Sequence, residues 1–420
     1  MHFSAIDWQK MVYLRGFAGS RPAIPTDSVK LELLAKVRMT AQAFAYVAGG
    51  AGSEQTMKAN RAAFDECQII PRMLRNVSER DTRVDLLGMK LPAPVILAPV
   101  GVLELVHHEA DLAASRAAAA LQLPFIFSNQ ASYPMERCAQ GMGDAPRWFQ
   151  LYWSKSNALV TSLVQRAEKC GCSAIVVTLD TTMLGWRPRD LDLGYLPFLE
   201  GKGIAQYTSD PVFQKIMNET DNVVLERRVN LSAIQGLISL VNRYPGKGFF
   251  RKLRSGKPLK AVQTFVSTYS NPGTTWDDLK FLRDQTGLKL ILKGVLHPDD
   301  AKKALDHGVD GIIVSNHGGR QVDGSIATLR ALPGIVTAVK GNVPVLLDSG
   351  IRGGSDIFKA LALGAKAVCV GRPYAYGLAI AGQQGVEDVL RNLMTEFELT
   401  MGLAGCKSLS DINVEMLAHH

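Results

Sequence analysis

Short apolar runs alternate with helical patterns along this chain from residue 94 onward. Eight of these runs are rich in β-branched residues and lack polar alternation, which is typical of parallel strands covered on both faces. They span residues 94–98, 125–128, 148–151, 174–180, 289–293, 311–315, 344–348 and 367–371. Between them, residues 156–170 carry an apolar stripe that stops at Gly171, and residues 298–307 begin with Pro298 and end before Gly308, as helices do. Eight strand–helix units predict a closed (β/α)8 TIM barrel of the α/β class.

Two parts of the chain depart from this alternation. Residues 1–90 predict helices around 28–48 and 53–64 and then a short polar hairpin near 83–90, which together would cap the barrel. After the fourth strand, residues 188–274 are rich in Gly, Pro and charged residues and predict one clear helix, over 230–241. A structureless segment of this size is usually a functional lid or partly disordered. We therefore expect a single domain over residues 1–420, with an N-terminal helical cap and a long lid insertion after strand 4.

Composition favours an ordinary globular protein of the cytoplasm. With 420 residues and 47% hydrophobic content the chain can bury a large core. Its apolar stretches are broken by Pro, Gly and Glu before reaching the ~20 residues of a spanning helix, and the N-terminus lacks the pattern of an export signal. Six cysteines form no CxxC pair, which suits a reducing compartment. We expect a cytoplasmic protein with no membrane partner.

The positive charge does not point to nucleic acid. The formal net charge is +8, but the excess is scattered or lies in residues 243–260 rather than along a periodic helix face. A solvated surface, or attraction of small acidic substrates, explains this distribution better. We therefore expect no nucleic-acid partner.

Polar residues follow nearly every predicted strand. The active site of a TIM barrel lies at the carboxyl ends of its strands, and buried polar groups cost about 1–3 kcal/mol each when they are unpaired. Their concentration at one rim therefore indicates a functional site. In strand order they are Gly101; Ser128 and Gln130; Gln150 and Tyr152; Thr178 and Asp180; Lys293; Ser315, His317 and Arg320; Asp348; and Gly371 with Arg372.

Two glycine-bearing turns after the last two strands favour phosphate binding. Residues 348–355 (DSGIRGGS) and 371–373 (GRP) place backbone N–H groups near predicted helix starts, beside Arg352 and Arg372. Barrels commonly bind phosphate with these two loops, and the paired arginines make tight turning alone a weaker explanation. No strand-linked GxGxxG and no Walker loop is present, which argues against a nicotinamide dinucleotide or nucleoside triphosphate. The adjacent His107, His108 and Glu109 lack a partner motif, and we expect no metal site.

Residues 314–324, VSNHGGRQVDG, resemble the hallmark of the FMN-dependent α-hydroxy-acid oxidases and dehydrogenases. The resemblance runs from about Ala43 to Tyr376, with the order kept across every strand end. Within the family, residues 185–191 (GWRPRDL), the long insertion after them and the run from Pro99 to Gly101 are most similar to lactate 2-monooxygenase. Related oxidases typically carry alanine at the position of Gly101.

The resemblance implies FMN lying across the strand ends. Lys293 would stand beside N1 and the C2 carbonyl of the ring, where a positive charge stabilises the reduced, anionic flavin. The phosphate would meet the two glycine-bearing loops, and the ring would contact backbone after strand one and side chains of later strands. The implied cofactor-binding residues are Pro99, Val100, Gly101, Ser128, Gln150, Thr178, Lys293, Ser315, Asp348, Ser349, Gly350, Arg352, Gly371 and Arg372.

The same resemblance assigns roles around the substrate. His317 would take a proton from the substrate, and Asp180 would stabilise the imidazolium. Arg320 and Tyr46 would bind the substrate carboxylate, Arg320 through its planar fork. Arg187 would add a second cation, and Tyr152 would hydrogen-bond the substrate oxygen. Gly318 and Gly319 would let the chain turn sharply enough for base and cation to face one cavity.

The implied reaction is FMN-dependent oxidation of an L-2-hydroxy acid, with L-lactate the expected substrate, by O₂. If the keto acid stays bound, peroxide would decarboxylate it, and lactate would become acetate, CO₂ and water; Gly101 and the long lid favour this outcome. The alternatives are an oxidase that releases 2-keto acid and H₂O₂, a quinone-coupled dehydrogenase and, from a different class, a non-redox barrel that binds a phosphate ligand. The family's tendency toward tetramers and octamers implies a homo-oligomer.

Overall fold

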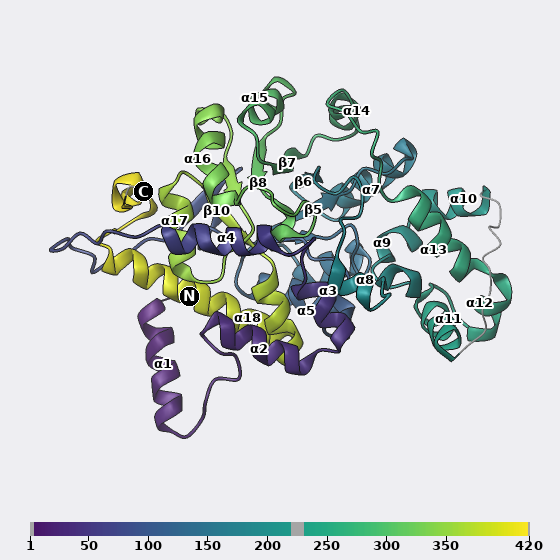
Figure 1. Ribbon diagram of the computed structural model, residues 1–420, viewed down its shortest axis with the longest axis horizontal. Coiled ribbons are helices and arrows are strands. Elements are labelled where there is room, and N and C mark those ends of the chain that lie inside the picture. The colour runs from purple at the N-terminus through teal and green to yellow at the C-terminus, as the bar shows by residue number, and fades with distance from the viewer. Residues whose placement is uncertain (1–3, 220–230, 419–420) are drawn as a thin grey trace.

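A closed barrel of eight parallel strands forms the centre of the computed structural model, which describes residues 4–219 and 231–418 (Figure 1). The strands follow one another around the barrel in the order β10-β3-β4-β5-β6-β7-β8-β9. They are β3 Val95–Leu97, β4 Phe125–Phe127, β5 Arg147–Leu151, β6 Ala174–Thr178, β7 Lys289–Val295, β8 Gly311–Val314, β9 Val345–Leu347 and β10 Ala367–Val370. The predicted (β/α)8 TIM barrel is confirmed, and each predicted strand overlaps an observed one.

Side chains of the barrel strands alternate between its inside and its outside. Leu97, Phe127 and Val177 pack outward in the larger core, whereas Ile96, Ile126 and Val176 pack against one another inside. This two-residue period continues past the strand ends. It therefore directs the following residues toward the barrel axis at the carboxyl end: Ala98, Ser128, Gln150, Thr178, Lys293, Ser315, Asp348 and Cys369.

The opposite end of the barrel is closed by the antiparallel hairpin of β1 (Val84–Leu86) and β2 (Met89–Leu91). Val84, Leu86 and Leu91 share one apolar cluster with the side chains inside the barrel. The hairpin predicted near residues 83–90 is confirmed. Because apolar side chains close this end, the carboxyl ends of the strands are the accessible end of the barrel.

Helices surround the barrel and match the predicted alternation. The helix predicted over 156–170 is capped by Ser156, whose hydroxyl accepts a hydrogen bond from the Leu159 N–H at 3.3 Å, and the helix predicted over 298–307 begins at Pro298. The outer helices are α5 Ala110–Ala120, α6 Met135–Met142, α7 Asn157–Lys169, α14 Asp278–Gln285, α15 Pro298–Asp306, α16 Thr328–Val339, α17 Gly354–Ala362 and α18 Arg372–Leu403. Short 3-10 turns are η1 Leu103–Leu105, η3 His317–Gly319, η4 Leu409–Asp411 and η5 Val414–Met416.

The N-terminal segment contains four helices: α1 Ala5–Phe17, α2 Ser28–Arg38, α3 Ala41–Ala48 and α4 Gln55–Glu66. The helical region expected over 28–48 is divided in two. Met39 is extended, and the Thr40 hydroxyl caps α3 by accepting a hydrogen bond from the Ala43 N–H at 3.1 Å. Helix α1 was not predicted. Helix α3 carries Tyr46 to the mouth of the barrel.

The expectation of a largely structureless insertion after the fourth barrel strand is wrong. Short helices are separated by Gly or Pro residues, so none produces a long periodic pattern in the sequence. Tyr207 and Phe198 pack on Phe265, with ring centroids 4.8 and 5.2 Å apart, and give the insertion an aromatic core. Its elements are α8 Pro188–Asp192, η2 Pro197–Glu200, α9 Ala205–Thr208, α10 Pro211–Glu219, α11 Leu231–Arg243, α12 Phe249–Ser255 and α13 Lys257–Thr268. The helix predicted over 230–241 corresponds to α11, and residue 230 lies outside the described residues.

Candidate active site

A cavity opens at the carboxyl ends of the barrel strands. Seventeen residues singled out from the sequence line it: Tyr46, Pro99, Val100, Gly101, Gln130, Tyr152, Arg187, Lys293, His317, Gly318, Arg320, Asp348, Ser349, Gly350, Arg352, Gly371 and Arg372. The structure therefore gathers at one cavity residues that are more than three hundred positions apart.

Three other predicted residues, Ser128, Gln150 and Thr178, lie buried beneath the lining of this cavity. The Ser128 hydroxyl donates to Gln150 Oε1 at 3.2 Å, and Gln150 Nε2 donates to Thr178 Oγ1 at 3.0 Å. This row crosses β4, β5 and β6 on the inner side of the barrel. Contact of these side chains with the flavin ring stays a prediction.

The end of the cavity formed by the last two strand loops fits a phosphate. Gly350 has a φ of +95°, and a Cβ there would lie 3.0 Å from Phe64 and 3.1 Å from the Asn60 carbonyl oxygen, so this backbone turn requires glycine. Among the described residues, neither Arg352 nor Arg372 has a carboxylate within 4.0 Å of its guanidinium. Burial lowers the pKa of Arg352, and it lowers the pKa of Arg372 to about 10.

These two cations therefore lie beside the glycine-bearing loops without an anionic partner in the described chain. Arg372 instead donates to the carbonyls of Val47 and Gly318, at 3.0 and 2.9 Å. A dianionic phosphate would supply the missing negative charge. The donor set fits FMN, with its phosphate at this end.

Lys293 is buried on the floor of the cavity between two carboxylates. Its Nζ lies 2.8 Å from Ser315 Oγ, 3.2 Å from Asp348 Oδ2 and 3.8 Å from Asp180 Oδ2. Burial alone would lower the pKa of Lys293, but the charges of Asp180 and Asp348 outweigh it, and the pKa is raised. The floor therefore presents a permanent positive charge, which suits an anionic flavin ring.

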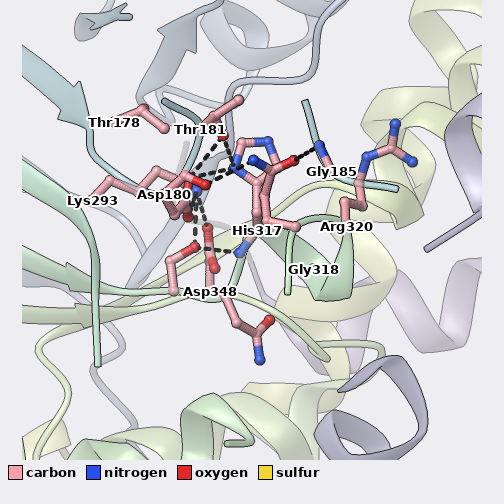
Figure 2. Close-up of polar contacts among 12 residues, drawn as sticks. Thr178, Asp180, Thr181, Gly185, Lys293, His317, Gly318, Arg320 and Asp348 are labelled. Atoms are coloured by element: carbon pink, nitrogen blue, oxygen red, sulfur yellow. Dashed lines mark hydrogen bonds and ion pairs between the residues drawn. The ribbon is translucent and has the colours of Figure 1, made fainter. Parts of the chain in front are cut away.

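His317 and Asp180 form a close pair at the edge of the cavity, as Figure 2 shows. His317 Nδ1 lies 2.7 Å from Asp180 Oδ1, and Thr181 Oγ1 bridges the two at 3.1 and 3.0 Å. Burial raises the pKa of Asp180, but His317 and Lys293 outweigh it and hold that pKa well below its usual range. An ionised Asp180 places the imidazole proton on Nδ1. The Nε2 atom of His317 is therefore left to accept a proton.

The loops after β8 and β9 are tied together directly beside this pair. The Ser349 hydroxyl accepts a hydrogen bond from the Gly318 N–H at 2.9 Å and donates to Asp348 Oδ1 at 2.6 Å. His317 and Ser349 both have positive φ values, 58° and 75°, which residues other than glycine rarely adopt. Such strain persists where surrounding contacts determine the backbone, as at functional sites. Gly318 and Gly319 follow with φ of 65° and 75° and make the sharp turn predicted from the sequence.

We expect the pH profile to report the pKa of His317. Burial is the largest effect and lowers this pKa from 6.5, and Asp180 opposes it only in part. The base is therefore neutral and active at neutral pH, and activity should fall only as pH drops through a value below 6.5. In D180N the opposing charge is lost, so this acidic limb should move to still lower pH, and kcat should fall on the order of 10²-fold. If the acidic part of the pH–activity profile were unchanged in D180N, the interaction of Asp180 with His317 would be contradicted.

Gly294 allows Asp180 to approach both His317 and Lys293. It lies at a shift in strand register between Lys293 and Val295, with φ +108°. A Cβ at this position would lie 2.9 Å from Asp180 Cβ and 3.0 Å from both Asp180 Cγ and the Asp180 backbone nitrogen. These distances leave no room for a methyl group. The glycine therefore sets the position of the carboxylate that orients the base.

We expect G294A to displace Asp180 and to lower kcat by at least ~10-fold, with a loss of about 1–3 kcal/mol in stability from backbone strain. G308A is a matched control, because Gly308 has φ +66° and nothing within 4 Å of an added Cβ. Thermal unfolding and kcat should be measured for both. Loss of rate in both variants would show that strain alone, not contact with Asp180, causes the effect.

Arg320 and Arg187 bring two further cations to the cavity. The Arg320 guanidinium lies over the Tyr46 ring, 5.0 Å from its centroid, and donates to the Gly49 carbonyl at 2.8 Å. It extends away from the His317–Asp180 pair (Figure 2). Burial, reinforced by Arg187, lowers the pKa of Arg320 to about 9. Among the described residues, neither arginine has a carboxylate within 4.0 Å, so a substrate carboxylate would find two uncompensated cations here.

Two phenols, of Tyr46 and Tyr152, also line the cavity. Burial raises the pKa of Tyr46, and it raises the pKa of Tyr152 to about 12. Both side chains are buried and line the cavity. Because they stay protonated at neutral pH, they can donate hydrogen bonds to an anionic ligand.

Several lining residues were not identified from the sequence. Cys369 continues the inward-facing positions of β10, so strand parity could have found it. Leu184, Phe198 and Tyr269 come from the loop after β6 and from the insertion. The short helices of the insertion carry no pattern that would predict which of their apolar residues face the cavity.

The fold and site define a flavoprotein barrel, and comparisons with known proteins give its family. The model of the FMN-dependent dehydrogenase family matches residues 35–419. The chain belongs to this family, whose cofactor is FMN, and the resemblance seen in the sequence is confirmed.

Named relatives act on 2-hydroxy acids. The chain is 43% identical over 388 residues to an L-lactate oxidase of Lysinibacillus sphaericus (strain C3-41), covering 92% of this chain and 91% of that protein. It is 38% identical over 368 residues to 2-hydroxyacid oxidase 1 of Homo sapiens, covering 88% and 90%. The crystal structure of mandelate oxidase with (S)-4-hydroxymandelic acid superimposes with a TM-score of 0.77 at 35% identity, covering 94% of this chain and 98% of that one. This protein is an FMN-dependent 2-hydroxy-acid oxidoreductase.

Proposed function

We propose that the protein oxidises L-lactate with O₂ and decarboxylates the product before releasing it, giving acetate, CO₂ and water. The His317–Asp180 pair, 2.7 Å apart and facing a cavity with uncompensated cations, carries the assignment of 2-hydroxy-acid oxidation. The similarity to an L-lactate oxidase supports lactate as the substrate. A cytoplasmic location, a homo-oligomer and a single domain with cap and lid stay predictions.

When bound, FMN would supply the two-electron acceptor for the substrate and the chemistry that reduces O₂. Arg320, Arg187 and Tyr46 bind the substrate carboxylate, and Tyr152 donates a hydrogen bond to the substrate oxygen. This places the α-carbon beside the base. His317 Nε2 takes the substrate proton, and the ionised Asp180 stabilises the resulting imidazolium. Lys293, fixed by Asp348 and Ser315, supplies positive charge at the flavin ring.

Retention of the keto acid decides between decarboxylation and release of peroxide. Phe198 and Tyr269 of the insertion line the cavity, so the insertion covers the bound product, and closure over an active site slows release. Oxidation of lactate by O₂ gives pyruvate and H₂O₂. Reaction of these two in the closed site gives acetate, CO₂ and water, and both steps balance in atoms.

Gly101 supports this outcome because it enlarges the cavity. A Cβ at Gly101 would lie 3.2 Å from Gln130 Cβ, so an alanine would press on Gln130 beside the flavin. We expect G101A to release more free pyruvate and peroxide per lactate than the wild type. An unchanged product ratio would remove Gly101 from this role.

Product analysis tests the proposed reaction. The holoenzyme is incubated with L-lactate under air, and acetate, pyruvate and peroxide are measured with and without catalase. We expect one acetate per lactate, unaffected by catalase, because decarboxylation takes place before release. Stoichiometric pyruvate and peroxide would assign an oxidase, and turnover with a quinone but not with O₂ would assign a dehydrogenase.

A further inference from the structure

The excess positive charge of the protein is concentrated on one part of the insertion. Residues 231–276 contain seven Lys and Arg residues and no Asp or Glu, whereas the formal net charge of the whole chain is +8. These residues include α11, α12 and α13, of which α11 and α12 lie together at the right-hand edge of the molecule in Figure 1. This segment therefore has a formal net charge of +7, against +8 for the whole chain.

Most of these cations have no acidic partner among the described residues. Arg243 pairs with Glu104 at 2.5 Å, and it is the one member with a carboxylate within 4.0 Å in the described ranges. Lys252 donates to the backbone carbonyl of Tyr244 at 2.9 Å and holds α12 against the end of α11. The remaining exposed cations are Lys247, Arg251, Arg254 and Lys257.

Large apolar side chains are exposed among these cations. On α12, Phe250 is 76% exposed, and Leu253 is exposed one turn later. On α11, which packs against α12, Ile234, Leu237 and Ile238 are exposed. Apolar side chains interleaved with Lys and Arg on surface helices are typical of elements that bind at a membrane interface.

We propose that α11 and α12 bind the surface of an anionic phospholipid bilayer. The basic side chains would meet lipid phosphates, and Phe250 and Leu253 would enter the region of the headgroups. A nucleic acid would satisfy the cations but would leave the exposed aliphatic side chains in water, whereas a bilayer satisfies both.

This partner departs from the expectation of no membrane contact, which rested on the lack of a spanning segment. In the part of the chain that the structure describes, no helix is long and apolar enough to cross a bilayer. The protein would therefore lie on the surface. Helix α11 also contacts η2, whose Phe198 lines the cavity, so binding here would place the mouth of the site close to the bilayer. The proposal does not rest on the reaction assigned above.

Co-sedimentation of the holoenzyme with vesicles tests the proposal. Vesicles of phosphatidylcholine alone are compared with vesicles that also contain phosphatidylglycerol. We expect binding to the anionic vesicles at least ~10-fold stronger than to neutral ones, and weakened by salt. R251E/R254E and F250S should each weaken this binding by at least ~10-fold while leaving lactate turnover unchanged.

Matched control variants distinguish binding through α11 and α12 from a general attraction by the positive charge of the protein. K340E/K366E makes the same charge change at exposed lysines elsewhere, and F17S removes a phenylalanine that is 94% exposed on α1. Both should bind as the wild type does. Each of three outcomes would overturn the proposal. K340E/K366E could lose as much vesicle binding as R251E/R254E, or F250S could bind vesicles as the wild type does. The protein could also bind a DNA duplex without binding vesicles.

Discussion

Replacing His317 by glutamine is expected to leave a folded, yellow protein whose flavin is no longer reduced at a useful rate by a 2-hydroxy acid. His317 has its Nδ1 held by Asp180 at 2.7 Å, so its Nε2 faces the ligand. A glutamine amide can fill this space and accept a hydrogen bond, but it cannot take a proton. Loss of a general base should slow reduction by ~10²–10⁴-fold.

Anaerobic stopped-flow measurement of flavin absorbance at saturating L-lactate gives this rate directly. His297 supplies a control, because it is an exposed histidine at the start of α15, outside the residues that line the cavity. H297Q should reduce its flavin at the wild-type rate. If H317Q also did so, His317 would not be the base.

Replacing Lys293 by methionine is expected to weaken FMN binding and to slow its reduction. Lys293 lies between Asp348 and Asp180, at 3.2 and 3.8 Å. Its removal leaves two buried carboxylates facing each other without the cation, and breaking a buried pair costs on the order of 3–5 kcal/mol. It also removes the positive charge that would stabilise the reduced ring.

Fluorescence titration with FMN and the anaerobic reduction rate measure the two effects. Lys289 offers a matched control on the same strand, because it is exposed at the opposite end of β7 and pairs with Asp310 at 3.1 Å. K289M should bind and reduce FMN normally. Unaltered binding and reduction in K293M would remove Lys293 from this role.

The barrel and the composition of its rim could be predicted because side chains along a β-strand alternate between its two faces with a period of two residues. Once Ile291 and Ile313 are placed inside the barrel, Lys293 and Ser315 must point the same way. His317 lies two residues further on, in the 3-10 turn η3, where it lines the cavity. The residues at the strand ends therefore converge without any knowledge of loop structure.

Other features depend on contacts between separate segments and left no signal in the sequence. Gly294 is required because β7 shifts its register against β8 and the chain passes close to Asp180. The Ser349 hydroxyl ties two loops whose relative position no periodicity predicts. Phe198 and Tyr269 reach the cavity from short helices broken by Gly and Pro, which conceal the packing of the insertion.

The central claim is that a 2-hydroxy acid gives its electrons to FMN held at the mouth of this barrel. Anaerobic titration of the purified protein with L-lactate, D-lactate, glycolate and mandelate, followed by visible absorbance, tests it most directly. The protein should be yellow as purified, and L-lactate should bleach its flavin absorbance completely. A colourless protein that does not take up FMN, or a flavin spectrum that no 2-hydroxy acid changes, would contradict the account.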